Sequence, residues 1–115
     1  MSGPTAEELG AALLPRIERE LETLRAASSG TAADRRPVEL DQQSVGRLSR
    51  MDAMQQQAMA AAQEARRHAR IGALEAALRR IASGEFGHCA ECGEVIGRRR
   101  LELDPTLPRC RDCAR

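Results

Sequence analysis

The sequence predicts a mainly α-helical protein: an antiparallel helical hairpin, or coiled coil, followed by a small C-terminal four-cysteine zinc finger. Two long segments carry apolar residues every three or four positions, the period of a helix that buries one face. Four cysteines form two CxxC pairs near the C-terminus. The 115 residues include one Phe and no Trp or Tyr, so the chain cannot easily fill a thick core and needs a staple such as a metal.

The first helix of the hairpin is expected to begin after Thr5, because Thr5 and Glu8 fit a capping box. Its length is about 22 residues, or about 33 Å. Pro15 lacks a backbone donor and is expected to bend the helix near its start. The apolar stripe consists of Leu9, Leu13, Ile17, Leu21 and Leu24.

The second helix is expected to span about 40 residues, with Asp41 or Ser44 as its N-cap and Gly84 as its end. The first helix is expected to fold back along its N-terminal half, and an intermolecular coiled coil is the alternative. The C-terminal stretch would then lean on the zinc module, with Phe86 as the plug. The expected buried positions are Val45, Leu48, Met51, Ala58, Ala62, Ala65, Ala69, Ile71, Leu74, Leu78 and Ile81.

The chain is therefore expected to divide into three regions. These are a disordered tail at residues 1–4, the hairpin at residues 5–84 with a loop at about residues 28–40, and the zinc-finger module at residues 85–115. The first residues lack a signal-peptide pattern, and no run of 18 apolar residues occurs. We therefore expect a cytoplasmic protein without a membrane partner, and we expect a monomer.

The cysteines predict one structural zinc ion, bound by Cys89, Cys92, Cys110 and Cys113. Each CxxC lets two sulfurs of one tight turn reach a metal at about 2.3 Å, and four thiolates leave no position for water. In a reducing compartment such pairs are more often metal sites than disulfides. The alternatives are free cysteines, local disulfides, or His88 as a replacement ligand.

The pattern FGHCAECGEVIGRRRL, beginning at Phe86, resembles the zinc finger of the DksA/TraR family, and Pro105 to Cys113 continues the match. With the predicted hairpin, the resemblance covers roughly residues 5–115. It implies a non-enzymatic regulator that binds bacterial RNA polymerase rather than promoter DNA. In this family the hairpin enters the polymerase secondary channel and alters transcription initiation.

The resemblance also identifies candidate functional residues. Asp41 aligns with an acidic residue of the family's hairpin tip, and Glu39 is a second tip candidate. Arg66, Arg99 and Arg100 align with arginines of the family, one that supports polymerase binding and two of an Arg-Arg-Leu motif. A helix cap is the alternative role for Asp41, and a solvated surface is the alternative for the arginines.

The family's positions for the alarmone ppGpp fall on Ala73, Asp104 and Ala114, which cannot supply the basic charge that a polyphosphate needs. We therefore expect no alarmone site of that kind. The net charge of +1 also gives no reason to expect DNA as the partner. A DNA-binding zinc finger, a transcript-cleavage stimulator similar to the Gre factors, and a scaffold or dimerisation module are the alternative functions.

Overall fold

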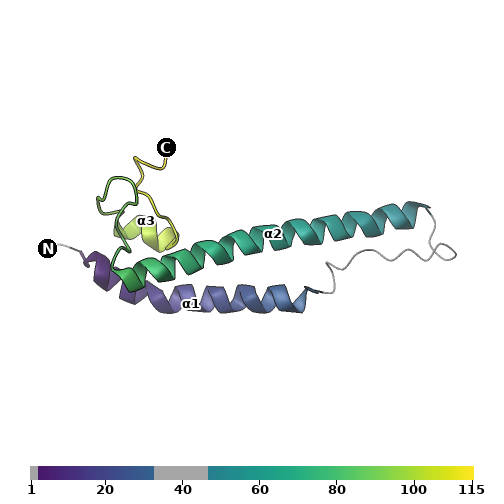
Figure 1. The fold of residues 1–115 in the computed structure, drawn as a ribbon, viewed down its shortest axis with the longest axis horizontal. Coiled ribbons are helices and arrows are strands. Elements are labelled where there is room, and N and C mark those ends of the chain that lie inside the picture. The colour runs from purple at the N-terminus through teal and green to yellow at the C-terminus, as the bar shows by residue number, and fades with distance from the viewer. Residues whose placement is uncertain (1–2, 33–46) are drawn as a thin grey trace.

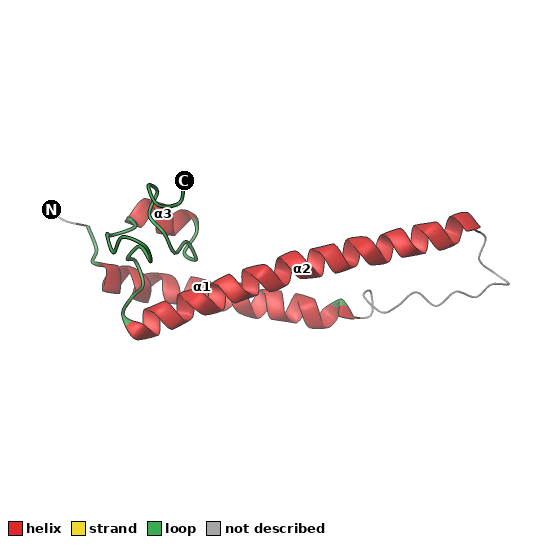
Figure 2. Ribbon diagram, turned by 45° about the horizontal axis from the view of Figure 1, so that its top comes forward, coloured by secondary structure: helices red, strands yellow, loops and turns green. Residues whose placement is uncertain are grey.

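The structure of the protein, a computed structural model, describes residues 3–32 and 47–115. The helices are α1 (Ala6–Gly30), α2 (Arg47–Ser83) and α3 (Arg98–Leu103). α1 and α2 run antiparallel, and α3 with its flanking loops lies at the end where α1 begins and α2 ends (Figure 1). Figure 2 shows helices and loops in the described part, where His88 and Val95 form an isolated β-bridge. The predicted fold class is confirmed.

α1 begins where the capping pattern places it. The Thr5 side chain accepts a hydrogen bond of 3.1 Å from the Glu8 amide, which satisfies a donor of the first turn. The helix is continuous through Pro15 and ends at Gly30 rather than before residue 28. Thr31 caps this end, because its amide and its hydroxyl both donate to the Ala27 carbonyl, at 3.1 and 2.8 Å. The predicted loop therefore starts later than expected.

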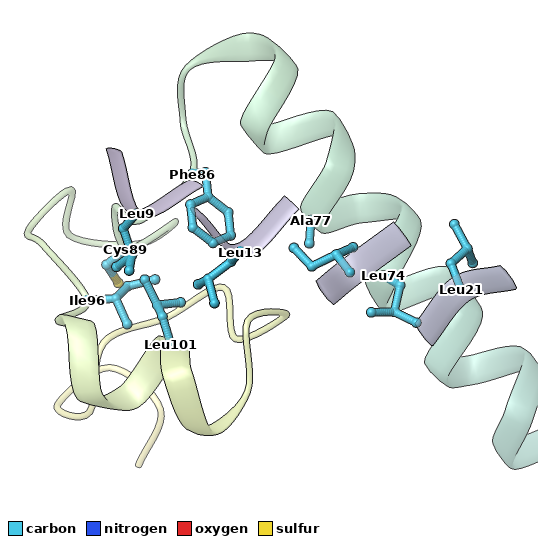
Figure 3. Packing of buried hydrophobic residues seen from close by; sticks show 10 residues of the cluster. Leu9, Leu13, Leu21, Leu74, Ala77, Phe86, Cys89, Ile96 and Leu101 are labelled. Atoms are coloured by element: carbon cyan, nitrogen blue, oxygen red, sulfur yellow. The ribbon is translucent and has the colours of Figure 1, made fainter. Parts of the chain in front are cut away.

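The core is a row of apolar side chains that runs from the helical hairpin into the zinc module (Figure 3). α1, α2 and the zinc module each contribute apolar side chains to this row. In the helices these side chains lie on one face, as their periodicity predicts. Phe86, the expected plug, is 4% exposed and lies in this row. The buried members are Leu9, Leu13, Ile17 and Leu21 of α1, Leu74 and Ala77 of α2, and Phe86, Cys89, Ile96 and Leu101 of the module.

The predicted register of the hairpin is wrong. α1 packs on the C-terminal half of α2, as the position of Gly10 next to Ile81 and Phe86 shows. Large aliphatic residues on this half of α2 match those of α1 and bury more apolar area than the alanines of the other half would. The N-terminal half of α2 consequently extends past the end of α1 (Figure 1).

The prediction of burial is also wrong for five positions on α2. The exposed side chains are Met51, Ala58, Ala62, Ala65 and Ala69. Glu64 is only 9% exposed, on a different face of the same helix. Alanine fits a surface as well as a close contact, so its spacing alone does not define the buried face. Val45 and the side chain of Leu48 lie outside the described residues.

Neither long helix has, within its described residues, a stretch apolar enough to cross a bilayer.

Candidate metal centre

The first cysteine pair lies in a compact turn that follows the end of α2. The Cys89 amide donates to the Glu94 carbonyl at 2.7 Å, and the Gly93 amide donates to the Cys89 carbonyl at 3.0 Å. Gly93 has φ of +76°, a conformation that glycine adopts without steric cost. These bonds fold the chain back after two residues, so the thiols of Cys89 and Cys92 point to one place.

The second pair closes the site from the other end of the module. The Ala114 amide donates to the Cys110 carbonyl at 3.0 Å, which forms the second turn. The Ala90 amide donates to the Pro108 carbonyl at 2.8 Å and joins the two turns. Backbone hydrogen bonds therefore bring together two cysteine pairs that are far apart in sequence.

The four sulfur atoms have the spacing of a zinc site. All four lie within 4.8 Å of one another, and the sulfurs of Cys92 and Cys110 are 3.7 Å apart. A tetrahedron with zinc–sulfur bonds of 2.3 Å has edges of about 3.8 Å. The cysteines therefore fit one structural zinc ion, and the prediction of a zinc cofactor is confirmed. His88 is exposed and lies outside this cluster of ligand atoms.

The protonation of the thiols reflects their crowding. Hydrogen bonds from the backbone of Cys110, and then of Cys92, lower the pKa of Cys89 to about 6. Hydrogen bonds with the other thiols, first with Cys110, raise the pKa of Cys113. One thiolate is thus favoured by backbone donors, while further thiolates need a cation to balance their charge. A divalent metal supplies that balance, as is general for four-thiolate sites.

Polar contacts hold the module against the hairpin. Arg16 of α1 donates to the backbone carbonyls of Glu102 and Leu103. Arg80 of α2 donates to the Thr106 carbonyl at 3.1 Å. All these carbonyls belong to the end of α3 and the segment after it. The hydrogen bonds from the hairpin therefore converge on one short stretch of the module.

Arg70 of α2 adds an ion-pair network to this contact. Its guanidinium binds both carboxylate oxygens of Glu20 on α1, and also Asp104 at 2.9 Å and Thr106 at 3.0 Å in the module. This arginine was not predicted from the sequence. The signal that could have found it is a charged residue directly before Ile71, in the apolar stretch of α2.

The remaining candidate residues lie on different elements. Arg66 is exposed on α2, and Arg99 is exposed on α3. Arg100, also on α3, is half-buried and donates from Nε to the Arg109 carbonyl at 3.1 Å. Glu39 and Asp41 lie outside the described residues. Their roles stay predictions.

Comparison with known proteins identifies the module. The family model of the prokaryotic dksA/traR C4-type zinc finger matches residues 84–115. The RNA polymerase-binding transcription factor DksA of Haemophilus influenzae is 50% identical over 40 residues, which are 35% of this chain and 28% of that protein. DksA of Escherichia coli strain K12 is 44% identical over 43 residues, 37% of this chain and 28% of its own length. The match therefore spans less than a third of the length of either relative.

The fold has a relative among solved structures. The structure of transcription factor DksA2 from Pseudomonas aeruginosa superposes with a TM-score of 0.67, over 92% of this chain and 77% of that one. Its sequence identity of 24% makes this a likeness of fold. These sequence relatives match over 40 and 43 residues, while the solved structure matches along most of the chain. Residues 84–115 thus match the zinc finger of the DksA/TraR family.

Proposed function

We propose that this protein is a non-enzymatic transcription regulator that binds bacterial RNA polymerase and inserts its helical hairpin into the secondary channel. One observation carries the proposal. A zinc finger similar to that of RNA polymerase-binding relatives is joined to a hairpin with the fold of DksA2. Such a partner would place the protein in the cytoplasm, where we expect it to act as a monomer.

The shape and charge of the hairpin support this proposal. The N-terminal half of α2 projects beyond the end of α1 (Figure 1). Residues 53–63 contain no charged side chain, and Met51, Met54 and Met59 are each more than half exposed. A helical stretch without charges loses little hydration when it enters a narrow protein channel. The zinc module at the opposite end is bulkier and would remain outside.

The candidate residues divide between these two ends. Glu39 and Asp41 would act at the hairpin tip, close to the polymerase active centre. Arg66 on α2, with Arg99 and Arg100 on α3, would bind the polymerase farther out. This division predicts that tip substitutions alter the effect on initiation, whereas arginine substitutions weaken binding.

Two partners are not part of the proposal. A ppGpp site of the family's kind would need basic charge at Asp104, but this carboxylate is bonded to Arg70. Sequence-specific DNA binding would need free basic residues on the module. Arg98 pairs with Glu102 and Arg109 pairs with Glu91, which reduces the positive charge available to phosphates.

Competition binding tests the proposal. Zinc-loaded protein is titrated against core RNA polymerase, and a Gre factor is then added as a competitor for the secondary channel. We expect binding that the competitor displaces. Absence of binding at micromolar concentration would contradict the proposal. Binding that the competitor leaves unchanged would contradict insertion into this channel.

The tip is tested separately with Asp41→Asn. This variant should retain its affinity for polymerase and lose part of its effect on initiation. Equal activity of variant and wild type in a promoter-complex lifetime assay would leave Asp41 as a helix cap.

A further inference from the structure

We infer that Arg70 is a positioning residue that fixes the orientation of the zinc module relative to the hairpin. The evidence is the way one guanidinium joins three parts of the chain: α1, α2 and the segment after α3. The structural part of this inference stands by itself. Its consequence for polymerase binding rests on the proposed function.

The guanidinium of Arg70 donates hydrogen bonds from both of its edges. Nε and Nη2 donate to the two carboxylate oxygens of Glu20, a bidentate pair. Nη1 donates to Oδ1 of Asp104 at 2.9 Å and to Oγ1 of Thr106 at 3.0 Å. The fork of arginine is planar and rigid, so these bonds define directions as well as distances. A rotation of the module about α2 would break the bonds of Nη1.

The acceptors in the module are themselves held in place. The Thr106 amide and hydroxyl both donate to Oδ1 of Asp104, at 3.0 and 2.7 Å. Pro105 between them is fully buried, and Thr106 is 8% exposed. Arg70 therefore binds a fixed turn, and the position of that turn is transmitted to the rest of the module.

The other arginine contacts between the two parts each involve one helix of the hairpin. The apolar contact through Phe86 and Leu101 is non-directional, because burial of apolar surface depends on area rather than angle. Arg16 and Arg80 each donate to backbone carbonyls of the module. Of these three arginines, only Arg70 forms hydrogen bonds both with the opposite helix of the hairpin and with the module. It thus locks the angle at which the module sits on the helix pair.

The orientation of the module relative to the hairpin matters if the hairpin tip and the module both bind the same partner. The module lies at the C-terminal end of α2, and Arg47, the residue of α2 nearest in sequence to the proposed tip, begins the helix at its other end (Figure 1). A small rotation at the module is therefore a large displacement at the other end. Polymerase would bind the module orientation that Arg70 holds. Loss of the Arg70 hydrogen bonds would therefore reduce the population of protein that can bind.

Residual dipolar couplings of backbone amides test the inference in zinc-loaded protein. In the wild type, one alignment tensor should fit α2 and the module together. In Arg70→Met the module should require its own tensor with a smaller magnitude, while the zinc content stays at one per chain. Arg70→Lys keeps the charge but cannot form the fork, so it should give an intermediate result. Arg79→Met, an exposed arginine on the same helix, is the matched control and should resemble the wild type.

A second variant controls for the possibility that Arg70→Met disrupts the packing of the two helices. Asp104→Asn weakens the contact with the module and leaves the Arg70–Glu20 pair that joins the two helices. It should also separate the tensors, to a smaller degree. A single tensor of undiminished magnitude in both Arg70→Met and Asp104→Asn would overturn the inference.

Polymerase binding gives the functional readout. If the locked orientation falls to about one tenth of the population, the apparent dissociation constant of Arg70→Met should rise about tenfold. Unchanged affinity in a variant whose tensors have separated would overturn the functional part. If the wild type itself does not bind polymerase, the proposed function fails, while the dipolar couplings still decide the role of Arg70.

Discussion

A Cβ atom placed on Gly87 would lie 2.8 Å from the Cβ atom of Ala6. The first turn of the zinc module thus rests directly on the first turn of α1. Gly87 has φ of +90°, which side-chain-bearing residues rarely adopt. Both the contact and the backbone conformation require glycine at this position, so the start of α1 and the zinc module meet here without a side chain between them.

Gly87→Ala should lower the free energy of unfolding by roughly 1–3 kcal/mol, from backbone strain and from the contact with Ala6. Thermal unfolding followed by circular dichroism measures the loss. Gly84→Ala is the control, because Gly84 has φ of +81° and a Cβ atom added there would meet nothing within 4 Å, so it reports strain without contact. Equal losses in the two variants would show that the contact with Ala6 contributes nothing.

Leu74→Ala should destabilise the hairpin by about 2–5 kcal/mol, because Leu74 is 0% exposed and its loss leaves a cavity between the helices. Urea unfolding gives the value. Leu103→Ala is the matched control: this leucine is 82% exposed, and its removal should change the stability by less than about 0.5 kcal/mol. Similar effects of both substitutions would contradict the described packing.

Glu20 should make the hairpin sensitive to acid. The hydrogen bond from Arg70 holds the pKa of Glu20 below its ordinary value of 4.5. Folded protein therefore binds this proton less readily than unfolded protein. The stabilisation is complete above pH 4.5 and is lost as the pH falls through the folded pKa.

The carboxyl carbon of Glu20, titrated by NMR, should have a midpoint below 4.5 in the wild type and a higher midpoint in Arg70→Met. The difference in stability between wild type and Glu20→Gln should shrink on acidification. A midpoint that is the same with and without Arg70 would refute the described ion pair.

Cys110→Ser should lose most of the bound zinc and the order of the module, while much of the helical signal of the hairpin remains. Four thiolates hold the ion, and a hydroxyl is a poor replacement for one of them. Zinc is measured by a colorimetric chelator, and helix content by circular dichroism in the far ultraviolet. Ala114→Ser, an exposed neighbour, should bind a full equivalent of zinc. Full stoichiometry in the cysteine variant would contradict the four-cysteine site.

The parts of the fold that sequence predicted well depend on local patterns. The stripe from Leu9 to Leu21 is buried, because large aliphatic residues at helical spacing have one way to leave water. The zinc site followed from two CxxC turns, each of which forms within a few residues. The register of α1 on α2 did not follow, because it depends on which half of α2 offers more apolar area.

The contacts that dock the module could not be predicted from local pattern. Arg70 is 50 residues from Glu20 and 34 residues from Asp104 in sequence. An arginine among apolar residues is compatible with many partners, and only the tertiary arrangement selects these two. The Arg16 and Arg80 contacts end on backbone carbonyls, which carry no sequence signal at all.

Gly87 packs on Ala6, so the module that holds the zinc ligands is in direct contact with the start of α1. Binding of zinc to the folded module alone raises the stability of the module by mass action, and with it the contact between Gly87 and Ala6. Above the dissociation constant, each tenfold rise in free zinc adds about 1.4 kcal/mol to the free energy of unfolding of the module. The order of the first turn of α1, at Ala6, should therefore depend on the free zinc concentration of its surroundings, although α1 itself provides no ligand.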